Sequence, residues 1–216
     1  MITEEIKREV QSIISTLRSS NLDFGSNMIC GGFVPPFTNQ GDLKLIIVGQ
    51  DPTVKNEASR KKITCTLDLD KDRSMLRQYV ERICKGLSIE LSNVYATNLF
   101  KYFYEIPPSN TPDVLKKHLK PNLELLKEEL EELPLDCPII TLGQPVLHLL
   151  LSEKVKLRDY WGYSTGIEDK FAYISAGNNI FKRKVFPFCH QASLRKAFYN
   201  KTFDKYLSYV KMEMGR

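Results

Sequence analysis

Two segments far apart in the chain each place a side chain capable of acid–base chemistry at the end of an apolar run. Residues 43–48 read Leu-Lys-Leu-Ile-Ile-Val, Gly49 ends the run, and Asp51 follows two positions later. A second apolar run, at 185–188, is closely followed by His190. Ligands of open α/β sheets bind beyond the carboxyl ends of the strands. A carboxylate and an imidazole at two such ends therefore predict an active site, in which Pro52 restricts the backbone beside the acid.

The elements that must position these residues alternate between strand-length apolar runs and helical patterns. This alternation predicts βαβ units, and hence a three-layer αβα sandwich with a central, mostly parallel sheet of about four strands. The strand candidates are residues 43–48, 93–99, 138–142, 171–174 and 185–188. The helix candidates are residues 2–17, 74–84, 112–133, 143–151 and, as a broken helix, 192–212. No repeat or credible linker interrupts the chain, so we expect one domain over residues 1–216.

Composition limits the classes of function that need to be considered. No apolar stretch approaches the roughly 20 residues of a membrane span, and the N-terminus lacks a signal-peptide core, so we expect a cytoplasmic protein. The net charge of +5 is compatible with a polyanionic partner without requiring one. The five cysteines are widely spread, form no C-x-x-C pair and have no zinc spacing to a histidine, which predicts no metal site.

Five short segments together resemble motifs of the uracil-DNA glycosylase superfamily. Residues 49–52, Gly-Gln-Asp-Pro, are similar to the start of the water-activating motif GQDPYH of family 1. Residues 190–194, His-Gln-Ala-Ser-Leu, resemble the second motif, HPSPL in family 1 and HPAxL in family 4. Residues 94–101 are similar to the family-4 strand VYITNVVK, and residues 107–112 and 139–143 follow the family-4 order PPxNRxP and VIVTLG.

The sequence also departs from these family patterns. Thr53 and Val54 stand where family 1 has a Tyr, which helps to exclude thymine, and a His. Residues 63–67 contain no aromatic side chain, although the family stacks the extruded base on a Phe in this region. Family 4 binds an iron–sulfur cluster through four cysteines; Tyr102 and, approximately, Leu119 occupy two of those positions and the N-terminal C-x-x-C is missing, so we expect no cluster.

The resemblance implies hydrolysis of an N-glycosidic bond in DNA by base flipping, as in base excision repair. Asp51 would orient the attacking water and stabilise the sugar cation, while His190 would donate to the leaving base. Asn98 carries both a donor and an acceptor and can read the edge of a pyrimidine. The alternative is a purely structural role, in which Asn98 caps the end of its strand. Leu194 would fill the hole left by the flipped base, or else belong to the core. The remaining base-binding candidates are Gly49, Gln50, Pro52 and Thr53.

Contacts to DNA phosphates would position the strand without reading its sequence. The candidates, which in most proteins would simply be solvated surface, are Ser193, Arg195, Lys196, Lys61 and Lys62. By the same resemblance we expect a monomer that acts on single- or double-stranded DNA.

Two other functions remain open at this point. One is a non-catalytic module of the same fold that binds single-stranded nucleic acid, favoured by the missing aromatic residue and by Thr53. The other is a hydrolase of free nucleosides or nucleotides. The first predicts salt-sensitive binding without an abasic product, and the second predicts turnover of monomers with indifference to DNA.

Overall fold

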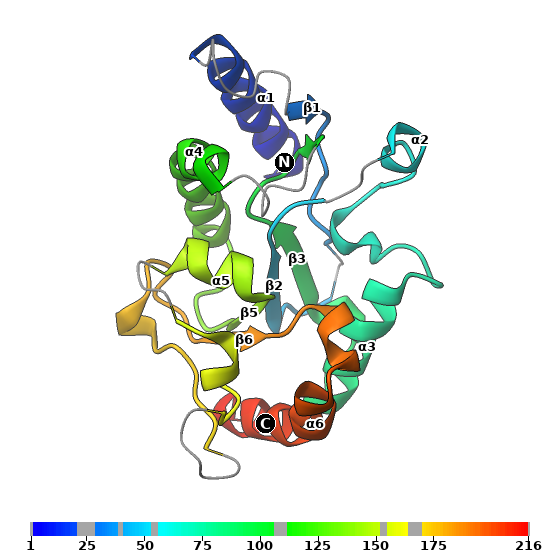
Figure 1. The fold of residues 1–216 in the computed structure, drawn as a ribbon, viewed down its shortest axis with the longest axis vertical. Coiled ribbons are helices and arrows are strands. Elements are labelled where there is room, and N and C mark those ends of the chain that lie inside the picture. Colours follow the sequence, from blue (N-terminus) through cyan, green and yellow to red (C-terminus); the bar gives the residue numbers. More distant parts are fainter. Residues whose placement is uncertain are drawn as a thin grey trace.

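The core of the protein is a parallel four-stranded sheet in the order β3-β2-β5-β6 (Figure 1). The computed structural model describes residues 2–20, 29–38, 41–52, 56–105, 112–151, 155–163 and 170–215. All three pairs of neighbouring strands are parallel. The strands, all fully buried, are β2 (Leu45–Gly49), β3 (Val94–Asn98), β5 (Ile139–Leu142) and β6 (Val185–Phe188). Burial on both faces explains why these strands read as continuous apolar runs rather than alternating ones.

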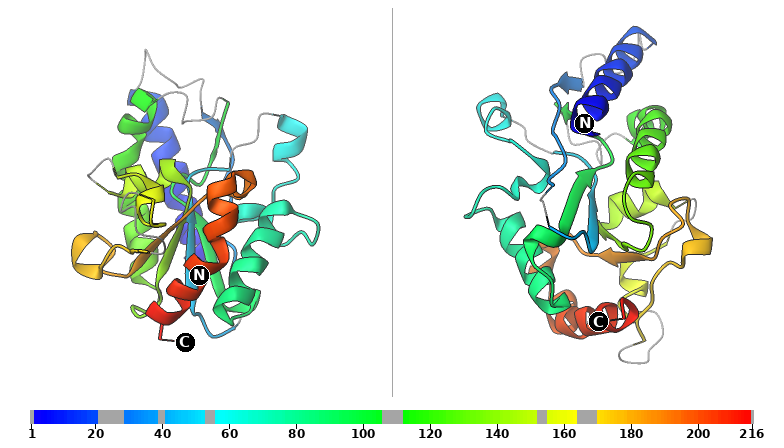
Figure 2. Two further views of the ribbon diagram at one scale, coloured as in Figure 1. Left: turned by 60° about the horizontal axis from the view of Figure 1, so that its bottom comes forward. Right: turned by 180° about the vertical axis from the view of Figure 1, so that it is seen from behind.

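Helices cover both faces of this sheet, which confirms the three-layer α/β sandwich (Figures 1 and 2). On one side α3 packs against α6, and on the other α1 packs against α4, with α5 beside it. The longer helices are α1 (Ile2–Ser20), α3 (Met75–Leu87), α4 (Pro112–Glu131), α5 (Gln144–Leu150) and α6 (Ala197–Glu213). Among the described residues, none of the helices is long and apolar enough to cross a membrane.

The break expected in the last helical pattern lies at Lys196. A 3-10 turn, η6 (Gln191–Arg195), precedes it, and α6 follows it directly. Lys196 itself has extended backbone angles, φ −75° and ψ 131°, which end one helix and begin the next. The turn therefore leaves His190, its N-cap, at the end of β6 rather than inside a helix.

One predicted strand, residues 171–174, is wrong. Phe171 and Ile174 form only isolated bridges, to Trp161 and Val185. The apolar side chains of this segment are used for packing on α6, where the Phe171 ring lies 5.5 Å from that of Tyr206. Phe171 and Tyr173 thus lie against α6, and the backbone of the segment pairs with the central sheet only through the bridge between Ile174 and Val185.

A second, antiparallel sheet was not expected from the sequence. It pairs β1 (Ile29–Gly31) with β4 (Phe103–Tyr104). The short helix α2 (Glu57–Arg60), N-capped by Asn56, was not expected either. Segments of two to four residues carry too little periodicity to stand out in a sequence.

Candidate functional site

The carboxyl edge of the sheet is hollowed by a pocket of about 550 Å³ to which the ends of all four strands contribute. Asp51 follows β2, Asn98 ends β3, Gly143 follows β5 and His190 follows β6, and all four residues line the pocket. The other lining residues are Gly49, Gln50, Pro52, Ile63, Cys65, Leu67, Asp68, Leu76, Leu142 and Pro145. This is the edge at which ligands of open parallel sheets bind.

Asn98 and Gly49 are direct neighbours in this pocket, paired in the register of β3 and β2. Asn98 is only 2% exposed, and its side-chain oxygen is buried without a hydrogen-bond partner. A Cβ on residue 49 would lie 2.3 Å from that oxygen, so only glycine leaves room for the Asn98 amide. A buried polar atom without a partner is costly unless a ligand satisfies it.

The segment that carries Asp51 is fastened to the chain that follows β3. The Leu99 N–H donates to the Gly49 carbonyl (2.9 Å) and the Phe100 N–H donates to the Gln50 carbonyl (2.8 Å). The side-chain nitrogen of Gln50 is buried without a partner, while Asp51 is half-buried. Thr53, also predicted to bind the base, lies outside the described residues.

His190 stands at the mouth of the pocket on a backbone held from two sides. The Tyr79 hydroxyl donates to the Cys189 carbonyl (2.7 Å), and the Trp161 indole N–H donates to the Pro187 carbonyl (2.7 Å). The Ala192 N–H donates to Nδ1 of His190 (3.4 Å), so the proton of the neutral ring lies on Nε2. Partial burial lowers the pKa of His190, which favours this neutral form. His190 can therefore donate a hydrogen bond from Nε2 without carrying a charge.

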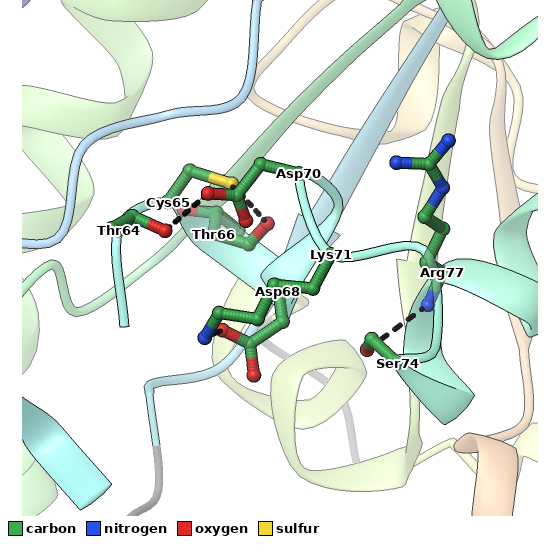
Figure 3. A network of polar contacts seen from close by, with 8 residues as sticks. All are labelled: Thr64, Cys65, Thr66, Asp68, Asp70, Lys71, Ser74 and Arg77. Carbon is green, nitrogen blue, oxygen red and sulfur yellow. Dashed lines mark hydrogen bonds and ion pairs between the residues drawn. The ribbon is translucent and has the colours of Figure 1, made fainter. Parts of the chain in front are cut away.

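Part of the pocket wall is a strained loop. Leu67 (φ 61°) and Asp68 (φ 51°) are consecutive left-handed residues that are not glycine, and both line the pocket. Asp70 holds the loop by accepting hydrogen bonds from the Thr64 hydroxyl and from the Cys65 thiol (3.2 Å), as Figure 3 shows. Strain of this kind is concentrated at functional sites. Neither Leu67 nor the loop was among the residues predicted to form the site.

An aliphatic wall takes the place of the aromatic ring on which the family stacks the extruded base. The described residues that line the pocket include no aromatic side chain. Leu67 instead extends toward the end of β2, and its Cδ2 lies 3.5 Å from where a Cβ of Gly49 would be. Phe100 and Phe188, two aromatic residues close by in sequence, are fully buried in the core.

The residues predicted to contact DNA fall into two groups that the structure does not bring together. Ser193 and Leu194 are half-buried on η6, directly after His190, and Leu194 packs against the core. The other group, beyond α2, is exposed, and Lys61 pairs with Glu57 (2.9 Å). Figure 1 shows α2 at the upper right, apart from the orange turn before α6. Arg195, the last residue of η6, and Lys196, its C-cap, are both exposed.

A buried polar cluster occupies the region where the family-4 resemblance would place cluster-binding cysteines. The Tyr104 hydroxyl lies 2.9 Å from Nδ1 of His118 and 3.2 Å from the Tyr102 hydroxyl, to which the Asn122 amide donates (3.0 Å). An iron–sulfur cluster of the family-4 kind is held by four cysteine thiolates, and this buried polar cluster offers phenol, imidazole and amide groups instead. Burial raises the pKa of Tyr104, and the Tyr102 hydroxyl and, less, the Asp51 carboxylate add to this rise. The described residues contain no group of three or more His, Cys, Asp or Glu side chains that could hold a metal ion.

Fold and site together define an α/β protein whose strand ends present an acid, an amide and a neutral imidazole to one pocket. A family model described as the uracil DNA glycosylase superfamily matches residues 35–211, a range that includes the whole sheet and every residue lining the pocket. The chain therefore belongs to the uracil DNA glycosylase superfamily, and this membership indicates DNA glycosylase activity in general. No curated protein matches the chain.

Proposed function

We propose that this protein is a DNA glycosylase that hydrolyses the N-glycosidic bond of uracil or of another deaminated or damaged base. One observation carries the proposal: Asp51, Asn98 and His190, from the ends of three strands, line a single pocket. Membership of the superfamily supports it independently of this geometry.

In the proposed reaction a water molecule replaces the base on the sugar. The bond between the anomeric carbon and the base nitrogen breaks, and its electron pair leaves with the base. The Asp51 carboxylate stabilises the resulting sugar cation and accepts a proton from the water whose oxygen bonds to the anomeric carbon. The Nε2–H of His190 donates to the carbonyl oxygen on which the negative charge of the leaving base gathers. Asn98 reads the edge of the base.

Recognition of the base would depend on hydrogen bonds and shape more than on stacking. Two unpartnered polar atoms, the side-chain oxygen of Asn98 and the side-chain nitrogen of Gln50, offer an acceptor and a donor. Gly49, Pro52 and Thr53 would complete the base-binding wall. The aliphatic side chain of Leu67 would meet the base where an aromatic ring is expected in the family.

The remaining assignments concern the DNA strand and the state of the protein. Leu194 would fill the hole in the duplex, and the phosphate contacts would come from Ser193, Arg195, Lys196, Lys61 and Lys62. We further propose that the chain acts as a single-domain monomer in the cytoplasm, without an iron–sulfur cluster. The phenol and imidazole donors near position 102 support the absence of a cluster.

A single-turnover assay tests this function. End-labelled oligonucleotides would carry uracil, hypoxanthine, xanthine or thymine, opposite G, opposite A and in single strands, and alkali would reveal abasic sites. We expect Asp51→Asn to lower the excision rate about 10²–10⁴-fold, the scale of a positioned acid–base group. Asp42→Asn is the matched control, because Asp42 lies before the same strand at its opposite, exposed end.

Each other outcome points to a different function. Excision by Asp51→Asn at the wild-type rate would refute the role of the acid. Salt-sensitive DNA binding without an abasic product on any substrate would indicate a protein that only holds nucleic acid. Turnover of free nucleosides, with no effect of DNA, would indicate a nucleoside hydrolase.

A further inference from the structure

A buried ion pair lies directly behind the base pocket. The Lys101 ammonium and the Glu129 carboxylate, from α4, are 2.6 Å apart, and their side chains are 1% and 0% exposed. Removing two charges from water is costly, and replacing such a pair by apolar residues is often neutral or stabilising. Stability alone therefore does not explain an ion pair that is buried this deeply.

The contacts of this pair lead to Asn98. Lys101 Nζ also donates to the Asn98 backbone carbonyl (2.6 Å), and the Tyr95 hydroxyl donates to the other carboxylate oxygen of Glu129 (2.7 Å). Tyr95 and Asn98 both belong to β3, so a chain of charged and polar groups starts on the strand, passes through α4 and returns to its last residue. Burial, with the adjacent Glu129 carboxylate, raises the pKa of Tyr95, and the hydroxyl stays a donor.

The carbonyl that Lys101 holds is at the point where the strand stops and the site begins. Directly after it, the N–H groups of Leu99 and Phe100 donate to the carbonyls of Gly49 and Gln50. The carbonyl of Lys101 itself accepts from the Val34 N–H (2.8 Å). A shift of the backbone at Asn98 would therefore move its side-chain amide relative to the end of β2, against which that amide is closely packed.

We propose that Lys101, held in place by Glu129 and Tyr95, is a positioning residue that fixes the backbone of Asn98 so that its amide faces the base. The inference rests on the function proposed above, in which Asn98 reads the base. It assigns to Lys101 an effect on rate and base discrimination that is separate from its effect on stability.

The test uses two variants, because Lys101→Met alone leaves the Glu129 carboxylate buried without its partner and can unfold the protein. In the double variant Lys101→Met/Glu129→Gln both charges are removed, and the Gln can still accept from the Tyr95 hydroxyl. We expect the urea midpoint to fall in the single variant and to recover most of this loss in the double variant. The single-turnover excision rate should stay about 10–100-fold below wild type in the double variant, as expected for a reacting group misplaced by a fraction of an ångström to 1 Å.

Two further readouts separate positioning from a purely structural role. Discrimination between the excised base and a base the wild type rejects should fall about tenfold, whereas affinity for DNA with an abasic site, which has no base to read, should be unchanged. The matched control is Lys184→Met/Glu213→Gln. Lys184 also pairs with a carboxylate and donates to a backbone carbonyl (2.6 Å). It precedes β6, however, so it lies at the amino ends of the strands, away from the pocket at their carboxyl ends.

The outcomes distinguish the inference from the function on which it rests. A double variant that recovers stability, rate and discrimination together would overturn the positioning role and leave the glycosylase function standing. A wild-type protein that excises no base from any substrate would overturn both.

Discussion

Replacing Gly49 by alanine puts a methyl group against the amide that we assign to base recognition. The added Cβ would lie 2.3 Å from the Asn98 side-chain oxygen, whereas Cβ atoms essentially never approach closer than 3.0 Å. The oxygen must therefore move by at least about 0.7 Å. Misplacement of a reacting or reading group by about 1 Å costs on the order of 10²-fold in rate. We expect excision by Gly49→Ala to be about 10²-fold slower than wild type.

Stability should change much less than activity. Gly49 is not among the described glycines with positive φ, so alanine is compatible with its backbone and gains about 0.4–1 kcal/mol by restricting the unfolded chain. The overlap with Asn98 opposes this gain by about 1–3 kcal/mol, the usual cost of overpacking. The net loss should be no more than about 2.6 kcal/mol, so the variant should remain folded.

Single-turnover excision at saturating enzyme, together with urea denaturation, measures both effects. Gly177→Ala is the control, because a Cβ at position 177 meets nothing within 4 Å. Excision by Gly49→Ala at the wild-type rate, in a folded protein, would refute the reasoning that the Asn98 amide reads the base from this position. If Gly49→Ala loses activity only because the protein unfolds, the same reasoning is refuted.

Three further predictions concern the surroundings of the pocket. Burial and the nearby Lys117 lower the pKa of His118 from 6.5 to about 4, so the unfolded chain binds more protons than the folded protein between these pH values. The free energy of unfolding should therefore fall by about 2 kcal/mol, after allowance for solvent screening, as the pH falls through this window. Urea titrations at pH 7 and 4 should show this fall, and His118→Gln should remove most of it. Leu67→Phe should tighten binding of DNA that contains the excised base by about tenfold, since stacking on a ring contributes about 1–3 kcal/mol per base, and weaker binding would show that the wall is not a base contact. Arg195→Gln/Lys196→Gln should reduce the slope of log K against log salt concentration by about 1.5–2, and an unchanged slope would exclude both side chains from the phosphate contacts.

Periodicity and strand-end position were sufficient to predict most of the fold and the centre of the candidate site. The four central strands and the five longer helices were each predicted from their length, their apolar pattern and the turn residues that flank them. Asp51 and His190 were identified because a polar side chain shortly after a buried run lies at the carboxyl edge of a parallel sheet. Asn98 was added through the family resemblance, as the residue that would read the base.

The failures have a common physical origin in packing between distant segments. Residues 171–174 have the composition of a strand, and only the aromatic rings of α6 determine that they pack on a helix. The pair β1–β4 joins segments of two and three residues, too short for their pattern to show. In each case the sequence pattern is compatible with more than one partner.

By itself, the sequence predicted the four central strands and the five longer helices, and it placed Asp51 and His190 at strand ends that line the pocket. Tertiary structure alone decided that Leu67 forms a wall of the pocket, that Lys101 meets Glu129, and that α2 lies apart from the turn before α6. Propensity and burial pattern act over a few residues, so they can be read along the chain. Contacts such as that between Lys101 and Glu129 depend on the order of the strands and on the helix that covers them, and these are set by the packing of the whole core.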